Sequence, residues 1–322
     1  MYSRIAGTGR YLPEQILTNK DLEKLVDTTD EWIVSRTGIR QRHRVADHET
    51  TSTMSVEAAK QALAAAGVAA AEVDFVVVGT TTPDLIFPNV GTLVQRALGI
   101  HDCAAFSVEA ACSGFVYALA IADKFVRLGE AKNALVIGAE CITRITDWND
   151  RATCVLFADG AGAVVLQPSP EPGILTTITS ADGQYRDLLY YPYGVSFGFD
   201  KLRSNAPAGI TMKGNEVFKV AVNTLSRLVD QTLAKGGVDK SEIDWLVPHQ
   251  ANLRIIQAAA KKLDMPMERV VVTVQDHGNT SAASIPLALD VAVRDGRIKR
   301  GQLLLLETFG GGFTWGSALI RY

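Results

Sequence analysis

Apolar residues along this chain form short continuous runs that alternate with longer stretches of helical spacing. Runs such as Phe75–Val77, Ala134–Ile137 and Leu303–Leu306 predict buried strands. Between them, segments such as 114–128 carry apolar residues at helical spacing. Strands that are apolar on both faces and alternate with helices predict an α/β fold, with mostly parallel sheets covered on both sides.

The same pattern occurs twice. Residues 63–77 align with residues 233–247, where Leu, Ala, Gly, Val, Glu, Asp and Val recur at a constant offset. Both copies predict a helix that ends at glycine, a short loop and a buried strand. Fainter similarities follow in the same order: residues 96–98 and 106–108 resemble 261–263 and 272–274, residues 134–137 resemble 303–306, and residues 162–166 resemble 316–320. Together they indicate duplication of a unit of roughly 150 residues.

The join between the two copies is predicted near residues 167–173, where three prolines interrupt regular structure. This divides the chain into an N-terminal half, 1–172, and a C-terminal half, 173–322.

Three residues with useful chemistry follow predicted strands. Cys112 follows a strand of the first half, His249 follows Trp245–Val247, and Asn279 follows a strand predicted at Val270–Val274. Ligand sites in parallel α/β sheets lie beyond the carboxyl ends of strands. Two halves related by a pseudo-twofold axis would bring these residues to one cleft.

The composition narrows the class of protein. The chain has 322 residues, a net charge of −3 and no basic run, which gives no support for a nucleic-acid partner. Its most apolar stretch, Cys103–Ala122, is interrupted by Glu109 and is predicted to be buried rather than to cross a membrane. The first residues lack the apolar region of a signal peptide, so we expect a cytoplasmic protein. Four cysteines without paired spacing favour neither disulfides nor a metal site.

Cys112 is the strongest candidate nucleophile. It lies between a β-prone run, Ala105–Val108, and the helical segment 114–128, with small neighbours on both sides. A helix N-terminus stabilises thiolate over thiol, and small neighbours let a carbonyl approach closely. The alternative is a small buried side chain, which we prefer for Cys103, Cys141 and Cys154.

Two polar residues of the C-terminal half have two interpretations each. His249 would be either a hydrogen-bonded core histidine or a base or donor beside a thiolate. Asn279, taken alone, is typical of a turn or a helix cap, although an amide also suits an oxyanion. His277 would line the same site or point away from it, and His43, His48 and His101 are predicted to be structural.

Three consecutive glycines, Gly310–Gly312, follow the four leucines. They predict either a flexible turn or backbone N–H donors for an oxyanion. The segment lacks the Gly-Lys-Ser/Thr of a nucleotide phosphate loop.

Four motifs in order resemble one known family. They are Ala-Ala-Cys-Ser-Gly-Phe at 110–115, Val-Pro-His-Gln-Ala-Asn at 247–252, His-Gly-Asn-Thr-Ser-Ala-Ala-Ser at 277–284, and Phe-Gly-Gly-Gly-Phe-Thr-Trp-Gly at 309–316. The chain resembles the β-ketoacyl-acyl carrier protein synthases III, which start bacterial type II fatty acid synthesis. The resemblance spans essentially the whole chain and implies a thiolase-like, five-layered α-β-α-β-α fold in a homodimer.

The resemblance also implies a mechanism. Cys112 would accept the acyl group of a short acyl-CoA, with acetyl-CoA expected, and the N–H groups of Cys112 and Gly311 would bind the oxyanion. His249 and Asn279 would stabilise the enolate formed when malonyl-acyl carrier protein loses CO₂. No metal or organic cofactor is implied, because decarboxylation itself supplies the carbon nucleophile.

Further positions match the family one by one. Those that would bind CoA are Trp32, Arg36 and Arg151 at the nucleotide and Phe218 and Asn252 along the pantetheine. Those that would dock the carrier protein are Lys219, Arg254, Lys261 and Lys262, whose alternative is a solvated helix face. Phe87 would close the acyl pocket across the dimer interface, which favours a short primer.

Other functions fit less well. A biosynthetic thiolase needs a second cysteine near its C-terminus, and elongating condensing enzymes use two histidines where this chain has His249 and Asn279. The main alternative is a related acyltransferase that uses a longer acyl-CoA or a small-molecule acceptor. A non-enzymatic CoA-binding module is a further alternative, which the complete set Cys112, His249 and Asn279 disfavours.

Overall fold

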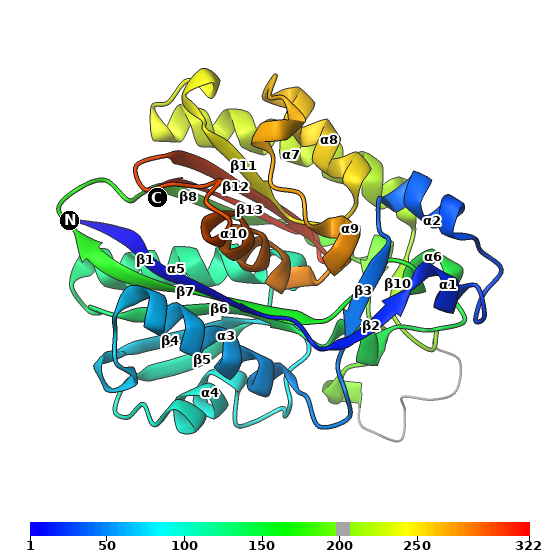
Figure 1. The fold of residues 1–322 in the computed structure, drawn as a ribbon, viewed down its shortest axis with the longest axis horizontal. Helices are drawn as coiled ribbons and strands as arrows, with labels where there is room; N and C mark the ends of the chain where they lie inside the picture. Colours follow the sequence, from blue (N-terminus) through cyan, green and yellow to red (C-terminus); the bar gives the residue numbers. More distant parts are fainter. Residues whose placement is uncertain (198–206) are drawn as a thin grey trace.

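The protein, seen here in a computed structural model that describes residues 1–197 and 207–322, has two main β-sheets within a stack of five layers (Figure 1). The first sheet has the strand order β1-β7-β6-β4-β5, and the second has the order β11-β12-β13-β8. The strands of the first sheet are β1 (Tyr2–Tyr11), β4 (Phe75–Gly79), β5 (Ala104–Val108), β6 (Ala134–Glu140) and β7 (Gly160–Ser169). Those of the second are β8 (Ile174–Ala181), β11 (Trp245–Pro248), β12 (Leu303–Gly310) and β13 (Thr314–Arg321).

Helices form the other three layers. The outer face of the first sheet is covered by α3 (Thr51–Ala66) and α4 (Val90–Leu98), and that of the second by α7 (Gly214–Gly236) and α8 (Leu253–Lys262). Between the sheets lie α5 (Gly114–Leu128) and α10 (Ser284–Arg294). The predicted five-layered α/β fold is confirmed.

Short elements join or flank these layers. They are β2 (Gln15–Thr18) with β3 (Gln41–Arg44), β9 (Leu189–Tyr190) with β10 (Thr211–Met212), and the helices α1 (Asn19–Leu22), α2 (Asp30–Thr37), α6 (Arg151–Cys154) and α9 (Val274–His277). None of the helices in the described residues combines the length and apolar character needed to cross a bilayer.

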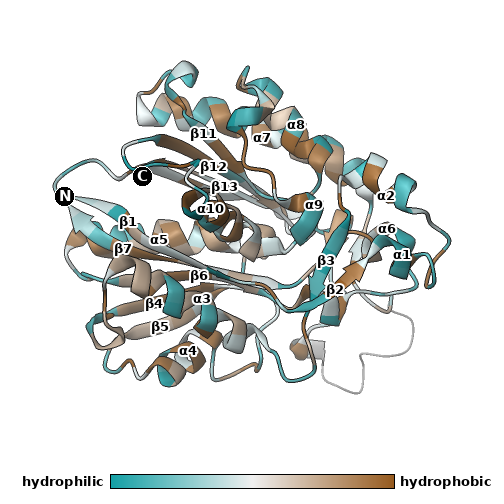
Figure 2. Ribbon diagram, viewed as in Figure 1, coloured by the Kyte–Doolittle hydropathy of each residue, from teal (hydrophilic) through white to brown (hydrophobic). Residues whose placement is uncertain are grey.

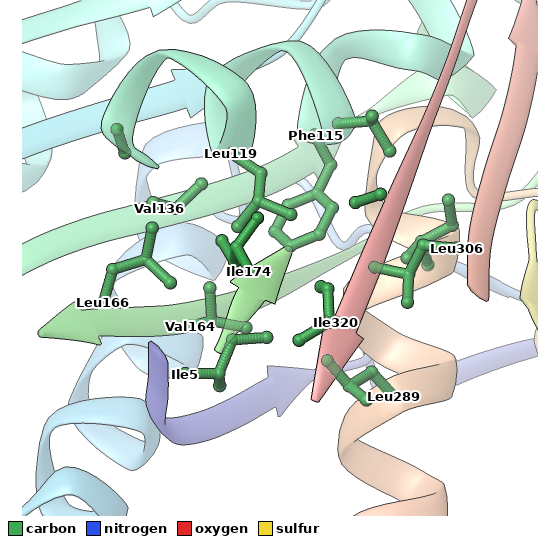
Figure 3. Packing of buried hydrophobic residues seen from close by; sticks show 14 of the residues in the cluster. Ile5, Phe115, Leu119, Val136, Val164, Leu166, Ile174, Leu289, Leu306 and Ile320 are labelled. Carbon is green, nitrogen blue, oxygen red and sulfur yellow. The ribbon is translucent and has the colours of Figure 1, made fainter. Parts of the chain in front are cut away.

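The largest core lies between the two sheets. Phe115 and Leu119 of α5 pack there against Val164 of β7, Leu289 of α10 and Ile320 of β13 (Figure 3). The hydropathy colouring shows α10 as strongly apolar, as expected for a helix enclosed by sheets (Figure 2). Each such fully buried side chain contributes about 1.5–3 kcal/mol to folding. This core fixes α5 and α10, whose first turns border the candidate site.

The strand pairing is more mixed than predicted. Among the described strands of the two main sheets, β4 pairs in parallel with β5 and β6, and β11 pairs in parallel with β12. The other four pairings, β1 with β7, β6 with β7, β12 with β13 and β13 with β8, are antiparallel. The prediction of mostly parallel sheets is wrong in this respect. That prediction overlooked that an apolar run such as Ala134–Ile137 of β6, which is buried along its whole length, can also pair antiparallel, here with β7.

The repeated sequence pattern forms the same local structure twice. Helix α3 ends at Gly67 and α7 at Gly237, both in the left-handed conformation, and each is followed by a 3₁₀ turn and then by β4 or β11. The chain passes from the first sheet to the second between Ser169 and Ile174. Descent of the halves 1–172 and 173–322 from one unit remains a prediction.

One predicted strand is wrong. Residues 270–274 make a single parallel bridge, Leu246 to Val270, and then enter α9. The buried side chain of Gln250 takes the place of a neighbouring strand. Its Oε1 accepts the N–H groups of Thr273 and Val274, and its Nε2 donates to the Val271 carbonyl. The Gln250 side chain therefore makes the backbone hydrogen bonds that a neighbouring strand would otherwise make, so this apolar run does not form a strand.

Candidate active site

Cys112 lies in a single 3₁₀ turn, Ala111–Ser113, between β5 and α5. The preceding residue, Ala111, has φ 46°, a conformation that L-residues rarely adopt and that is enriched at functional sites. A Cβ at Gly310, at the end of β12, would lie 2.7 Å from the Cys112 nitrogen. The turn thus places Cys112 at the N-terminal end of α5, as the sequence predicts, with a glycine strand end packed closely against it.

The sequence predicts that Cys112 rests as a thiolate, but its environment in the structure favours the protonated thiol. Burial raises the pKa of the Cys112 thiol to about 11, although the nearby Ser281 hydroxyl acts to lower it. A helix N-terminus contributes at most about 2 kcal/mol. That is too little to bring a pKa of about 11 down to 7, since each pH unit corresponds to about 1.4 kcal/mol. The thiol therefore keeps its proton at neutral pH.

His249 directly follows β11, and its side chain is held from behind. Its Nδ1 lies 2.6 Å from the Ser284 hydroxyl oxygen, which also accepts the Gln250 N–H at 3.2 Å. Among the described residues, Nδ1 of His249 is the one acceptor available to the Ser284 hydroxyl, so that hydroxyl donates to Nδ1. The proton of the neutral imidazole ring is therefore on Nε2. Burial lowers the pKa of His249 to about 3, so the ring is neutral at pH 7. His249 thus offers Nε2–H as a hydrogen-bond donor.

Asn279 is fixed by both its backbone and its side chain. Its N–H donates to the Leu156 carbonyl, and its carbonyl accepts the Ala158 N–H, both at 2.9 Å. Its Oδ1 accepts the Ser281 N–H at 3.0 Å, so the turn role considered from sequence is present. An amide whose oxygen is held in this way presents its NH₂ group to the other side. Asn279 therefore combines the turn role with an NH₂ group that has no acceptor among the described residues.

One cavity of about 230 Å³ is lined by Cys112, His249 and Asn279 together. Its walls come from α7, α8 and the ends of β11 and β12, and they are mostly apolar. Three distant segments of the chain thus bring a thiol and two neutral polar side chains to one cavity. The two halves do meet at one cleft, as the sequence predicts.

Glu307 of β12 also lines this cavity and was not singled out from the sequence. It is 1% exposed, and neither carboxyl oxygen has a hydrogen-bond partner among the described residues. Burial raises the pKa of Glu307 to about 8, so the carboxyl group is neutral at pH 7. Glu307 therefore adds no charge to the cavity lining at pH 7.

A second cavity opens on the other side of Cys112. It is lined by Cys112, Ser281, Gly311 and the aromatic residues Tyr190 and Tyr191. Gly311, the expected oxyanion donor, thus lies beside the same cysteine. Cys112 is common to both cavities and stands where they meet.

The expected CoA-binding residues gather near the mouth of the first cavity. The guanidinium groups of Arg36 and Arg151 each lie 4.9 Å from the centre of the Trp32 ring. Arg36, Phe218 and Asn252 line the cavity itself. Asn252 also caps α8, because its side chain accepts the Arg254 N–H at 2.9 Å, a role not foreseen from sequence.

The four basic residues expected to dock a carrier protein lie on α7 and α8. Lys219, Arg254 and Lys261 are exposed. Lys262 differs, since its ammonium group pairs with Asp230 at 2.8 Å, which offsets its charge. Arg254 also lies over the ring of Phe218, with 5.1 Å between guanidinium carbon and ring centre. The basic surface therefore borders the cavity mouth but is weaker at Lys262 than the sequence suggests.

Two other residues lie away from the cavities. Phe87 is 83% exposed, in a loop where Leu85 and Ile86 are exposed as well. His277 packs edge-on against His43, with ring centres 6.2 Å apart, and lines neither of the two cavities around Cys112. Of the two positions considered for His277, the one away from the site is correct.

The structure adds polar groups that sequence reasoning missed: Ser281, Ser284, Glu307 and Glu140. Ser281 and Ser284 stand inside the 277–284 motif, where their positions after Asn279 were the available signal. Glu140 is the last residue of β6, and Glu307 directly follows the four leucines inside β12, so each is a carboxyl group that interrupts or ends a buried apolar run. Such a position signals a carboxyl group brought to the site edge.

Comparison with known proteins gives a consistent result. The family profile "3-Oxoacyl-[acyl-carrier-protein (ACP)] synthase III" matches residues 106–183, and the profile of its C-terminal part matches residues 233–322. The chain is 64% identical over 322 residues to a β-ketoacyl-[acyl-carrier-protein] synthase III of Xanthomonas campestris pv. campestris, covering 100% of this chain and 99% of that one.

Solved structures agree. The 3-oxoacyl-[acyl-carrier-protein] synthase III of Aquifex aeolicus VF5 superposes with a TM-score of 0.92 at 48% identity, covering 99% of this chain and 100% of that one. The priming β-ketosynthase of the R1128 polyketide pathway superposes with a TM-score of 0.93 at 38% identity, covering 99% and 96%. Full-length identity, matched profiles and a shared fold all lead to the same conclusion: the chain belongs to the β-ketoacyl-[acyl-carrier-protein] synthase III family.

Proposed function

We propose that this protein catalyses the decarboxylative condensation of acetyl-CoA with malonyl-acyl carrier protein, which starts fatty acid synthesis. The products are acetoacetyl-acyl carrier protein, CoA and CO₂. One observation carries the proposal: Cys112, His249 and Asn279 line a single cavity, in a chain of this family.

In the first half-reaction the sulfur of Cys112 attacks the thioester carbonyl of the acyl-CoA. The C–S bond to CoA breaks, and the acyl group stays on the cysteine. The N–H groups of Cys112 and Gly311 are the proposed donors to the tetrahedral oxyanion. Removing one such donor typically costs about 10²–10³ in rate.

In the second half-reaction the malonyl group loses CO₂, and the electron pair left behind spreads onto the thioester oxygen. His249 Nε2–H and the Asn279 NH₂ group are both free to donate to that oxygen. Neutral donors suit this task, because they stabilise the enolate without giving it a proton. The carbanion then attacks the acyl group and releases Cys112. Decarboxylation supplies the nucleophile, so no cofactor is required.

We assign CoA binding to the Trp32, Arg36 and Arg151 cluster, with Phe218 and Asn252 along the pantetheine. The clustering of two guanidinium groups on one indole supports this, because adenine stacks on such surfaces and phosphates pair with arginine. Carrier-protein docking is assigned to Lys219, Arg254 and Lys261, with a smaller part for Lys262.

We also propose a homodimer in which Phe87 reaches the partner's second cavity. The exposure of Leu85, Ile86 and Phe87 supports this, because three adjacent large apolar side chains in water are unusual for a finished surface. A phenyl ring closing that cavity favours acetyl over longer primers. A cytoplasmic location is consistent with the four unpaired cysteines.

The test is a condensation assay with malonyl-acyl carrier protein and either acetyl-CoA or octanoyl-CoA. We expect acetoacetyl-acyl carrier protein from acetyl-CoA and little product from octanoyl-CoA. A strong preference for octanoyl-CoA would keep the chemistry but reject the short primer. Product formed without any carrier protein, on a small-molecule acceptor, would support the related acyltransferase instead.

A further inference from the structure

A buried carboxyl group, that of Glu140, has no role in the chemistry described so far. Glu140 ends β6, is fully buried and lines neither of the two cavities around Cys112. Its two oxygens accept hydrogen bonds of 2.5–3.3 Å from the Thr81 N–H and from the hydroxyl groups of Thr80, Thr81, Thr82 and Ser281. An ionised carboxyl group only accepts hydrogen bonds, so this set of donors matches the charged form.

Four of these five donors hold the carboxyl group from the side of the first sheet. They belong to the short segment Thr80–Thr82, which directly follows β4. The segment is itself cross-linked, because the Thr82 N–H donates to the Thr80 hydroxyl at 3.1 Å and the Thr82 hydroxyl accepts the Cys141 N–H at 2.8 Å. The position of Glu140 is therefore set by the N-terminal half of the chain.

The fifth donor, the Ser281 hydroxyl, connects Glu140 to Asn279. Ser281 Oγ donates to Oε1 of Glu140 at 3.2 Å. The backbone N–H of the same serine donates to Oδ1 of Asn279 at 3.0 Å. Ser281 thus lies between a carboxyl group that is held in place and the amide that lines the first cavity.

The backbone of Ser281 requires such an anchor. Its φ of 51° is a strained conformation for a residue with a side chain, and strain of this kind persists only where the surrounding structure imposes it. The next residue, Ala282, packs against β6 so closely that a Cβ at Gly138 would collide with its carbonyl oxygen. Strand β6 therefore holds the turn at two points on one face, by packing at Gly138 and by a hydrogen bond at Glu140.

The position of Ser281 decides which end of the Asn279 amide faces the cavity. The last torsion of an asparagine side chain is broad and roughly two-fold, so the amide can turn over. A turned amide would present its oxygen to the cavity in place of its NH₂ group. An oxygen there would repel the developing enolate. The Ser281 N–H prevents this turn only while Ser281 itself stays in place.

Resting on the proposed condensing function, we propose that Glu140 is a positioning residue for the condensation step. Through Ser281 it keeps the Asn279 NH₂ group directed at the thioester oxygen of malonyl-acyl carrier protein. Glu140 gains no proton and forms no bond to substrate in this role. It acts by keeping a neutral donor in place before negative charge develops on that oxygen, which is where a preorganised donor lowers the barrier.

The experiment is a double-mutant cycle in which acetyl transfer and condensation are measured separately. Burial raises the pKa of Glu140 to about 7, against hydrogen bonds from Thr82, Thr81 and Ser281, so assays at about pH 7.5 keep most of this group ionised. The variants are Glu140→Gln and Ser281→Ala, each alone and combined with Asn279→Ala. Glutamine keeps the size of the side chain but replaces one acceptor oxygen by a donor, and alanine removes the serine hydroxyl while keeping the N–H.

Asp123→Asn is the matched control. Asp123 is also fully buried and accepts a serine hydroxyl, that of Ser3 at 2.6 Å. It lies on α5 and lines neither cavity around Cys112. This control should leave both half-reactions at the wild-type rate.

In Glu140→Gln and Ser281→Ala we expect the kcat of condensation to fall about tenfold, less than the 10²–10³ typical of losing a donor outright. The KM for malonyl-acyl carrier protein and the single-turnover rate of acetyl transfer should stay close to wild type, because neither depends on the Asn279 donor. In the Asn279→Ala background neither substitution should cause a further loss, since the amide that they position is absent.

Three results would overturn the positioning role. They are wild-type condensation by Glu140→Gln or Ser281→Ala, the same loss with and without Asn279, and an equal slowing of acetyl transfer in variants whose urea unfolding shows them to be folded. Absence of any acetyl transfer in the wild type would instead reject the proposed function itself.

Discussion

The Ser284 hydroxyl lies 2.6 Å from Nδ1 of His249, on the side of the ring away from its free nitrogen Nε2. This one contact both orients the imidazole and sets which nitrogen carries the proton. We therefore predict that Ser284→Ala slows condensation about tenfold to a hundredfold, the effect of losing one buried hydrogen bond of about 1–3 kcal/mol. Acetyl transfer to Cys112 should be unchanged, because it does not use the histidine donor. Measuring the two half-reactions separately tests this.

Thr280→Val is the matched control for Ser284→Ala. Thr280 is buried in the same segment, and its hydroxyl has no partner among the described residues. Removing it should leave both half-reactions intact. Equal slowing of acetyl transfer and condensation in Ser284→Ala would mean that Ser284 supports the fold rather than the histidine.

The substitution Asn279→Asp separates the two functions of the Asn279 side chain, which are the oxygen acceptor in the turn and the NH₂ donor. The aspartate keeps an oxygen for the Ser281 N–H but loses the donor and adds negative charge beside the developing enolate. Condensation should fall by at least about 10², while the acyl-enzyme still forms. Steady-state condensation and a single-turnover acylation assay separate these outcomes, and an active Asn279→Asp enzyme would contradict the donor role.

Close packing at the end of β12 predicts a steric effect on the oxyanion donor. An added methyl group in Gly310→Ala would lie 2.7 Å from the Cys112 nitrogen and cover its N–H. Acetyl transfer should slow by about 10²–10³. Gly183→Ala is the control, because no atom lies within 4 Å of the added carbon there. If Gly310→Ala transfers acetyl at the wild-type rate, the Cys112 N–H is not a donor.

The buried Glu307 predicts how stability depends on pH. Its folded-state pKa of about 8 lies above the unfolded value of about 4.3. Between these values the unfolded chain releases a proton that the folded protein keeps, so the free energy of unfolding falls as pH rises, by about 1.4 kcal/mol per unit. Glu307→Gln should therefore stabilise the protein more at pH 8 than at pH 5 in urea unfolding. The exposed Glu130→Gln should show no such trend, and a pH-independent effect of Glu307→Gln would refute the argument.

The basic surface gives a graded prediction. Lys219→Glu should raise the KM for malonyl-acyl carrier protein about tenfold at low salt, with little change at high salt, because exposed charges are screened. Lys262→Gln should have a smaller effect, since Asp230 already offsets that charge. Titration of initial rates with carrier protein at two ionic strengths measures both. A larger effect at Lys262 than at Lys219 would place the docking surface elsewhere.

Elements that are determined by neighbouring residues could be predicted from the local sequence. The helix that ends at Gly67 and the one that ends at Gly237 were predictable, because glycine in the left-handed conformation stops a helix within a few residues. The turn at Cys112 was predictable because a β-prone run directly precedes it and a helical pattern directly follows it. The segment 270–274 was not, because the groups that bind its backbone belong to Gln250, twenty residues earlier.

Properties that depend on tertiary burial could also not be predicted from the sequence. The turn at Cys112 indicates a thiolate, but the pKa of the thiol follows the burial that two sheets impose on it. Likewise the contact of Ser281 with Glu140 joins residues 141 positions apart. Sequence thus predicted Cys112, His249 and Asn279 as candidate site residues from their type and position, whereas their protonation states required the assembled fold.

The most direct test of the whole account is mass spectrometry of the intact protein after mixing with acetyl-CoA and then with malonyl-acyl carrier protein. We predict one acetyl adduct, located on the peptide that contains Cys112, which disappears as acetoacetyl-acyl carrier protein forms. An adduct on another residue, or product formation by Cys112→Ala at the wild-type rate, would contradict the account.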